Sequence, residues 1–229
     1  MSALCLARHG FLAACLATVA LLGATVCAAP GAVADPKAPP KFAEKLATAD
    51  TLAALRAGGF SLYLRHGPTD NSHPDRFPSV DLNDCRTQRP LTEEGRQLAA
   101  EVGQAIRAAR IPLADIHISP MCRVKDTAAA AFPGQAVLLD AHLMYTANLT
   151  RAQKAPILAR TRVLLSELVR PGSNRLVIAH GPNLMDLMAY FPKEATLVVF
   201  KPQGNGQFDY VASIPVAAWT NLLPAGALK

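Results

Sequence analysis

The chain has 229 residues, of which 51% are hydrophobic and 17% are charged, and its formal net charge is +6. This composition is ordinary for a globular protein, and the length is enough for one domain with a sizeable core. The excess positive charge favours anionic ligands. It does not indicate nucleic-acid binding, because the Lys and Arg residues are scattered rather than gathered on one segment.

The first 34 residues differ from the rest of the chain. Arg8 is the only strong charge before Asp35, and the apolar run Phe11 to Leu22 and small residues ending in Ala32-Val33-Ala34 follow it. A charge, a short apolar stretch and an A-x-A site are together typical of a secretory signal peptide. The alternative is an uncleaved membrane anchor, but the apolar run is short for a span of roughly 20 residues. We expect residues 1–34 to be removed, leaving no membrane span in a periplasmic or secreted protein.

A Pro-rich linker is expected at residues 35–50, and a single catalytic domain at residues 51–229. In chain order the patterns predict helices at 51–56, 92–109, 122–131, 150–169 and 183–189, and strands at 60–65, 115–118, 136–139, 175–179, 196–201 and 208–214. The region from 67 to 90 has no sustained periodicity and reads as a long loop, which is usually functional in a compact domain. Alternating strands and helices predict an α/β three-layer sandwich with a mainly parallel central sheet.

Three of the predicted strands end in residues that can bind a phosphate group. One ends in Arg65-His66-Gly67, another in Ser119-Pro120 with Arg123 one turn into the next helix, and a third in His180-Gly181. Each residue alone is more often structural. If the strands are neighbours, however, two arginines and two histidines meet where α/β sheets bind ligands. Guanidinium forks match phosphate oxygens, and a histidine can attack phosphorus.

These motifs resemble the histidine phosphatase superfamily, the phosphoglycerate mutase-like group, over nearly all of residues 60 to 214. The resemblance rests on four segments: Leu64-Arg65-His66-Gly67-Pro68-Thr69, Pro90-Leu91-Thr92-Glu93-Glu94-Gly95, Ile118-Ser119-Pro120-Met121-Cys122-Arg123 with Thr127-Ala128, and Val177-Ile178-Ala179-His180-Gly181. It implies that His66 is the nucleophile that becomes phosphorylated. It also implies that Arg65, Arg123 and His180 complete the phosphate pocket, with Thr69 near the phosphate. Gly67 would let the backbone approach the phosphoryl group.

The sequence departs from this family at the general acid. Many members have a glutamate in a Leu-x-Glu setting, where this chain has Leu143-Met144-Tyr145, and the other branch has an aspartate where this chain has Gly181. The leaving oxygen still needs a proton unless the leaving group is already good. Asp70, four residues from His66, is the first candidate donor. The other candidates are Asp140, His142 and, less favoured for its high ordinary pKa, Tyr145.

Loss of the signal peptide would leave two cysteines, Cys85 and Cys122. In an exported domain they are a candidate disulfide, the alternative being two free buried thiols. A bridge would pin the long loop over the phosphate site.

The sequence therefore predicts an exported phosphatase that hydrolyses a phosphomonoester through a phosphohistidine, without metal or cofactor, on a small phosphorylated substrate. No carboxylate-rich or Cys/His cluster has metal-binding spacing. The first alternative is a binding or regulatory protein that recognises phosphate with little turnover, and a weaker one is a phosphotransferase. Specificity is expected in residues 68–89 and 140–149.

Overall fold

Six strands form one sheet in the order β3-β2-β4-β1-β5-β6. The computed structural model describes residues 42–76 and 78–227, all within one compact unit, Pro40–Lys229. The predicted signal peptide lies outside the described residues. The strands are β1 (Ser61–Arg65), β2 (Leu113–Ile118), β3 (Leu138–Leu139), β4 (Asn174–Ala179), β5 (Leu197–Gly204) and β6 (Gln207–Ile214).

The centre of this sheet is parallel. β4 pairs in parallel with β1 on one side and β2 on the other, while β5 joins β1 in antiparallel orientation and forms a hairpin with β6. Because β1, β4 and β2 are neighbours that run the same way, their carboxyl ends meet at one edge. The three strand ends singled out in the sequence are therefore adjacent.

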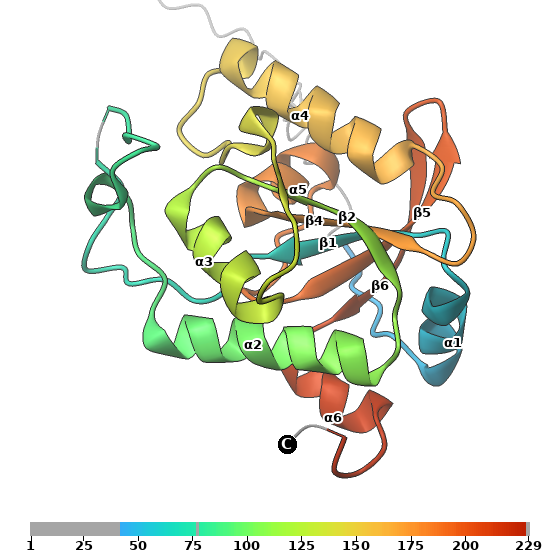
Figure 1. Ribbon diagram of the computed structural model, residues 1–229. Helices are drawn as coiled ribbons and strands as arrows, with labels where there is room; N and C mark the ends of the chain where they lie inside the picture. Colours follow the sequence, from blue (N-terminus) through green and yellow to red (C-terminus); the bar gives the residue numbers. More distant parts are fainter. Residues whose placement is uncertain (1–41, 77, 228–229) are drawn as a thin grey trace, which may run out of the picture. The chain divides into compact units, whose positions relative to one another are not determined.

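Helices cover both faces of the sheet, so the unit has three layers (Figure 1). On one face α1 (Ala49–Ala57), α2 (Glu93–Ala108), α3 (Cys122–Ala131) and α6 (Trp219–Leu222) share a core with Leu62 and Leu64 of β1. On the other face α4 (Arg151–Ser166) and α5 (Gly181–Met188) pack with Tyr63. Successive side chains of a strand point to opposite faces, so burial of all three places β1 between two cores. The predicted α/β sandwich is confirmed.

Threonine side chains cap the starts of α1, α2 and α4. Thr92 and Thr150 accept hydrogen bonds from the backbone N–H groups of Gly95 and Gln153, as expected for N-cap threonines. The first helix begins earlier than predicted, because Thr48 is its N-cap and Thr51 returns the bond as the third helical residue.

Part of the predicted linker packs on the domain. Phe42 stacks on Tyr190 with ring centroids 4.2 Å apart, and the N–H of Ala47 donates to the carbonyl of Ser213. Apolar and backbone contacts with the end of the sheet therefore order the chain before α1. Three short 3-10 helices, η1 (Cys85–Thr87), η2 (Ala141–Leu143) and η3 (Val216–Ala218), and α6 were not predicted.

Candidate active site

His66 lies directly after β1 and is buried, with 2% of its surface exposed. Its backbone N–H donates to the carbonyl of Ala179 in β4, and its ring Nδ1 lies 2.8 Å from the carbonyl oxygen of Gly67. Because a carbonyl oxygen can only accept, Nδ1 carries the ring hydrogen and Nε2 keeps its lone pair. Burial, followed by the charge of Arg123, lowers the pKa of His66 from 6.5 to about 3. The ring is thus neutral and has a free nucleophilic nitrogen at neutral pH.

His180 faces this ring from the end of β4, with the ring centroids 5.4 Å apart. Its Nε2 lies 2.8 Å from the hydroxyl oxygen of Ser119, which follows β2, and its backbone N–H donates to the hydroxyl of Tyr63. The ring is fully buried, and Nδ1 has no partner among the described residues. Burial, followed by the charge of Arg123, holds the pKa of His180 well below its ordinary value. His180 is therefore a neutral, fixed imidazole beside His66.

The two predicted arginines are held by different parts of the chain. Arg65 donates from Nη1 to the carbonyl of Pro192 at 2.6 Å, and its Nη2 lies 3.2 Å from Glu194. Arg123, at the start of α3, is fully buried, and its Nη1 donates to Asp75 Oδ1 at 2.9 Å. Burial lowers the pKa of both arginines. Nε of Arg65 and both Nε and Nη2 of Arg123 are buried donors with no partner among the described residues.

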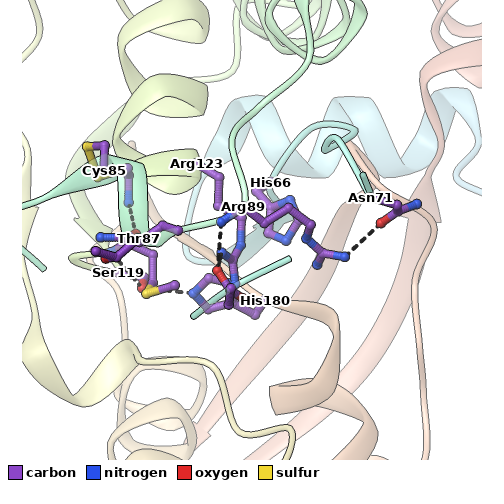
Figure 2. Close-up of polar contacts among 12 residues, drawn as sticks. His66, Asn71, Cys85, Thr87, Arg89, Ser119, Arg123 and His180 are labelled. Atoms are coloured by element: carbon purple, nitrogen blue, oxygen red, sulfur yellow. Dashed lines mark hydrogen bonds and ion pairs between the residues drawn. A yellow bond between two sulfur atoms is a disulfide. The ribbon is translucent and has the colours of Figure 1, made fainter. Parts of the chain in front are cut away.

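A third arginine, Arg89, completes the cationic site, and the sequence reasoning missed it. Its Nη1 donates to Asn71 Oδ1 at 2.8 Å, while its Nε is buried without a partner among the described residues (Figure 2). Its charge contributes to the lowered pKa of His66 and of His180. The available signal was its position immediately before the Pro90-Leu91-Thr92 segment.

The loop between β1 and α2 is fastened to α3. A disulfide joins Cys85 to Cys122, and the N–H of Cys122 donates to Gln88 Oε1 at 2.8 Å. Within the loop, the N–H of Arg76 donates to the carbonyl of Thr87. These contacts hold Arg89 at the site. The predicted pairing of the two cysteines is present in the structure.

Gly67 and Thr69 lie near the start of this loop, and both are tightly packed. A side chain on Gly67 would place its Cβ 2.4 Å from the carbonyl oxygen of Gly95, so the absence of a side chain serves the packing of α2 against the strand end. Thr69 is buried, with 8% of its surface exposed, and its hydroxyl has no partner among the described residues.

The candidate proton donors fall in different places. Asp70 lies on the surface, where its carboxylate accepts from Ser72 and contacts His73. The hydrogen bonds from Ser72 lower the pKa of Asp70 to about 2, which favours the ionised form and counts against a donor role. Asp140 pairs with Arg160 at 2.6 Å.

His142 is exposed on η2, and no contact joins it to the site residues within the described part of the chain. Tyr145, by contrast, is brought to the site. Its ring centroid is 5.8 Å from that of His180 and 5.3 Å from the guanidinium carbon of Arg123. The ring of Tyr145 therefore lies beside both His180 and Arg123.

Solved structures that are similar to this chain have the same fold. One is a putative alpha-ribazole-5'-phosphate phosphatase from Escherichia coli K-12, with 14% identity and a TM-score of 0.52, covering 69% of this chain and 97% of that one. Another is an alpha-ribazole phosphatase from Shigella flexneri, with 12% identity and a TM-score of 0.51, covering 69% and 96%. At such identities the likeness shows the fold alone, which is that of the phosphoglycerate mutase-like proteins.

A family model also matches part of the sequence. Residues 62–144 match the model of the histidine phosphatase superfamily, branch 1. The resemblance to this superfamily is therefore confirmed by a family match and by the fold. No curated protein matches the chain.

None of the helices in residues 42–76 and 78–227 has the length and apolar character needed to cross a membrane. The same residues contain no group of three or more His, Cys, Asp or Glu side chains placed to hold a metal ion.

Proposed function

We propose that this protein is a metal-independent phosphatase that hydrolyses a phosphomonoester through a phosphohistidine on His66. The observation that carries the proposal is a buried, neutral imidazole beside guanidinium N–H groups that have no partner among the described residues. Buried N–H groups are nearly always hydrogen-bonded, so several unpaired ones around one point indicate an anionic ligand. The superfamily match supports phosphatase chemistry.

In the first step, His66 Nε2 attacks phosphorus and the bond from phosphorus to the leaving oxygen breaks. The hydrogen bond from Nδ1 to the Gly67 carbonyl keeps the ring oriented and stabilises the positive charge that the ring gains. Arg65, Arg89 and Arg123 stabilise the charge spread over the equatorial phosphoryl oxygens. In the second step, water attacks the phosphohistidine, phosphate departs and His66 returns to its neutral form.

The test is rapid-quench kinetics with an aryl phosphate. A burst of aryl alcohol equal to the enzyme concentration, together with acid-labile phosphate bound to the protein, is the expected result. His66→Ala should lower turnover by roughly 10³-fold or more, as loss of a nucleophile does. His73→Ala is the matched control, because His73 is an exposed histidine on the neighbouring loop. Turnover that survives in His66→Ala would refute the proposal.

The alternative function is phosphate recognition with little turnover, which the absent family glutamate favours. The same experiment separates the two functions. A recognition protein would bind inorganic phosphate or vanadate in calorimetry but release no alcohol from an aryl ester at acid or neutral pH. A phosphotransferase would show the burst and then speed up when an alcohol acceptor is added.

Export to the periplasm or the medium is a further part of the proposal. The sequence of residues 1–34 supports it, and the Cys85–Cys122 bridge agrees with it because disulfides persist in oxidising compartments. Expression of the full chain with cell fractionation, followed by amino-terminal sequencing, tests it. The mature chain should begin at Asp35, whereas an intact amino terminus in the cytosolic fraction would refute export.

A further inference from the structure

The reaction proposed above needs an acid on the leaving-group side, and this inference rests on that proposed function. The leaving oxygen of an alkyl phosphate is strongly basic once the bond to phosphorus breaks, so it must receive a proton. Of the carboxylates in the described residues, two form ion pairs with arginines of the site: Asp75 with Arg123 and Glu194 with Arg65.

Asp75 is held in place by two hydrogen bonds to one oxygen atom. Its Oδ1 accepts from Arg123 Nη1 at 2.9 Å and from the backbone N–H of Arg89 at 2.8 Å. The side chain is 19% exposed. Asp75 thus contacts two of the three arginines that surround His66, and no other described carboxylate does so.

Asp75 also borders the space that a leaving group would enter. A cavity of about 270 Å³ is lined by Asp75 and Tyr145 together with apolar side chains that include Leu82, Met121, Met144 and Leu149. Tyr145 contacts both Arg123 and His180, so the cavity opens directly beside the phosphate pocket. Glu194 does not line this cavity, so Asp75 is the better placed of the two carboxylates.

We propose that Asp75 is the proton donor to the leaving group. As His66 Nε2 forms its bond to phosphorus, the electron pair of the breaking P–O bond goes to the leaving oxygen, which takes the carboxyl proton of Asp75. In the second step the Asp75 carboxylate takes a proton from the attacking water, so phosphate is released and the carboxyl group is restored.

Binding of substrate prepares Asp75 for this role. In the free site its carboxylate accepts the hydrogen bond of Arg123. A bound phosphoryl group competes for that donor, so the ion pair of Asp75 with Arg123 changes when substrate binds.

The experiment compares two esters that differ in their need for acid. Benzyl phosphate has a poor leaving group, and 2,4-dinitrophenyl phosphate has a good one that departs without a proton. Asp75→Asn keeps an oxygen that can accept from Arg89 and Arg123 but removes the acid. It should lower kcat for benzyl phosphate about 10²–10⁴-fold and that for the dinitrophenyl ester less than tenfold. Thermal melting confirms that the variant folds.

Three further variants make the result specific. Asp81→Asn is the matched control, since Asp81 is an exposed aspartate of the same loop without a contact to a site arginine in the described structure. Asp70→Asn and Glu194→Gln test the competing carboxylates. A selective loss on benzyl phosphate in either of these, with Asp75→Asn unaffected, would overturn the inference.

The remaining outcomes also decide between roles. Equal losses on both esters in Asp75→Asn would mean that Asp75 only positions the arginines, and the donor role would be refuted. A wild-type protein that hydrolyses neither ester would refute the proposed function itself, and the inference would fall with it. Wild-type turnover of both esters with no effect of Asp75→Asn would refute the inference alone.

Discussion

The bridge between Cys85 and Cys122 should contribute strongly to stability, and its removal is the most direct perturbation of the site loop. The two cysteines are 37 residues apart in the chain. In the chain-entropy description, closing a loop of that length in the unfolded state is worth about 3.8 kcal/mol at 25 °C. For a domain of this size, that free energy corresponds to a fall in Tm of roughly 8–15 °C.

The double variant Cys85→Ser with Cys122→Ser is compared with the oxidised wild type by thermal unfolding and by turnover of an aryl phosphate. The value of kcat/KM should fall as well, because Arg89 and Asp75 belong to the loop that the bridge fastens to α3. Wild-type protein with and without a reducing agent is the matched control.

Two results would refute the reasoning. Two reactive thiols in the unfolded, unreduced mature protein would show that no bridge forms. A Tm lowered by less than about 2 °C in the double variant, with the bridge demonstrated in the wild type, would show that the loop is held by Gln88 and its other hydrogen bonds instead.

Three other predictions concern ligand affinity, pH and substrate shape. Arg89→Ala should weaken binding of inorganic phosphate in calorimetry by roughly 10–150-fold, because a charge-assisted hydrogen bond is worth about 1.5–3 kcal/mol. Arg86→Ala, which changes an exposed arginine of the same loop, should leave phosphate affinity unchanged. An equal loss of affinity in both variants would argue against a specific role of Arg89. The pKa of folded His66 is about 3, below its ordinary value of 6.5, so unfolding takes up a proton between these values. The free energy of unfolding should therefore decrease as the pH falls from 6.5 towards 3, and His66 contributes up to about 1.4 kcal/mol per pH unit to this decrease. Urea unfolding at a series of pH values measures it. The free energy of unfolding should depend less steeply on pH in His66→Asn than in the wild type. Within a series of linear alkyl phosphates, kcat/KM should rise about fourfold per methylene until the apolar cavity beside Asp75 is full. A value of kcat/KM that does not change with chain length would mean that the leaving group lies elsewhere.

Residues whose role depends on local sequence were predictable. The bounds of α3 agree with the prediction, and the strand ends that carry His66 and His180 lie side by side because β1 and β4 are parallel neighbours. These features follow from hydrophobic periodicity, N-cap chemistry and the rule that parallel strands end at one edge.

Residues whose role depends on the shape of the long loop were not predictable. Four aspartates lie between residues 70 and 84, and no local pattern distinguishes Asp75 from the others. Its position is fixed by contacts with Arg89 and Arg123, which are 14 and 48 residues away. The packing of Phe42 on Tyr190 is likewise a long-range contact that the Pro-rich composition conceals.

The pairing of β1 with β4 sets the order in which the protein can form. Ser61 aligns with Arg175, so the two central strands meet only after more than a hundred intervening residues have been made. Closing so long a loop is slow compared with the docking of α2 on α3, and the Cys85–Cys122 bridge encloses only that local segment. The bridge can therefore close before β4 has joined β1 in the sheet. The phosphate pocket is complete only after that later step, because β4 carries His180.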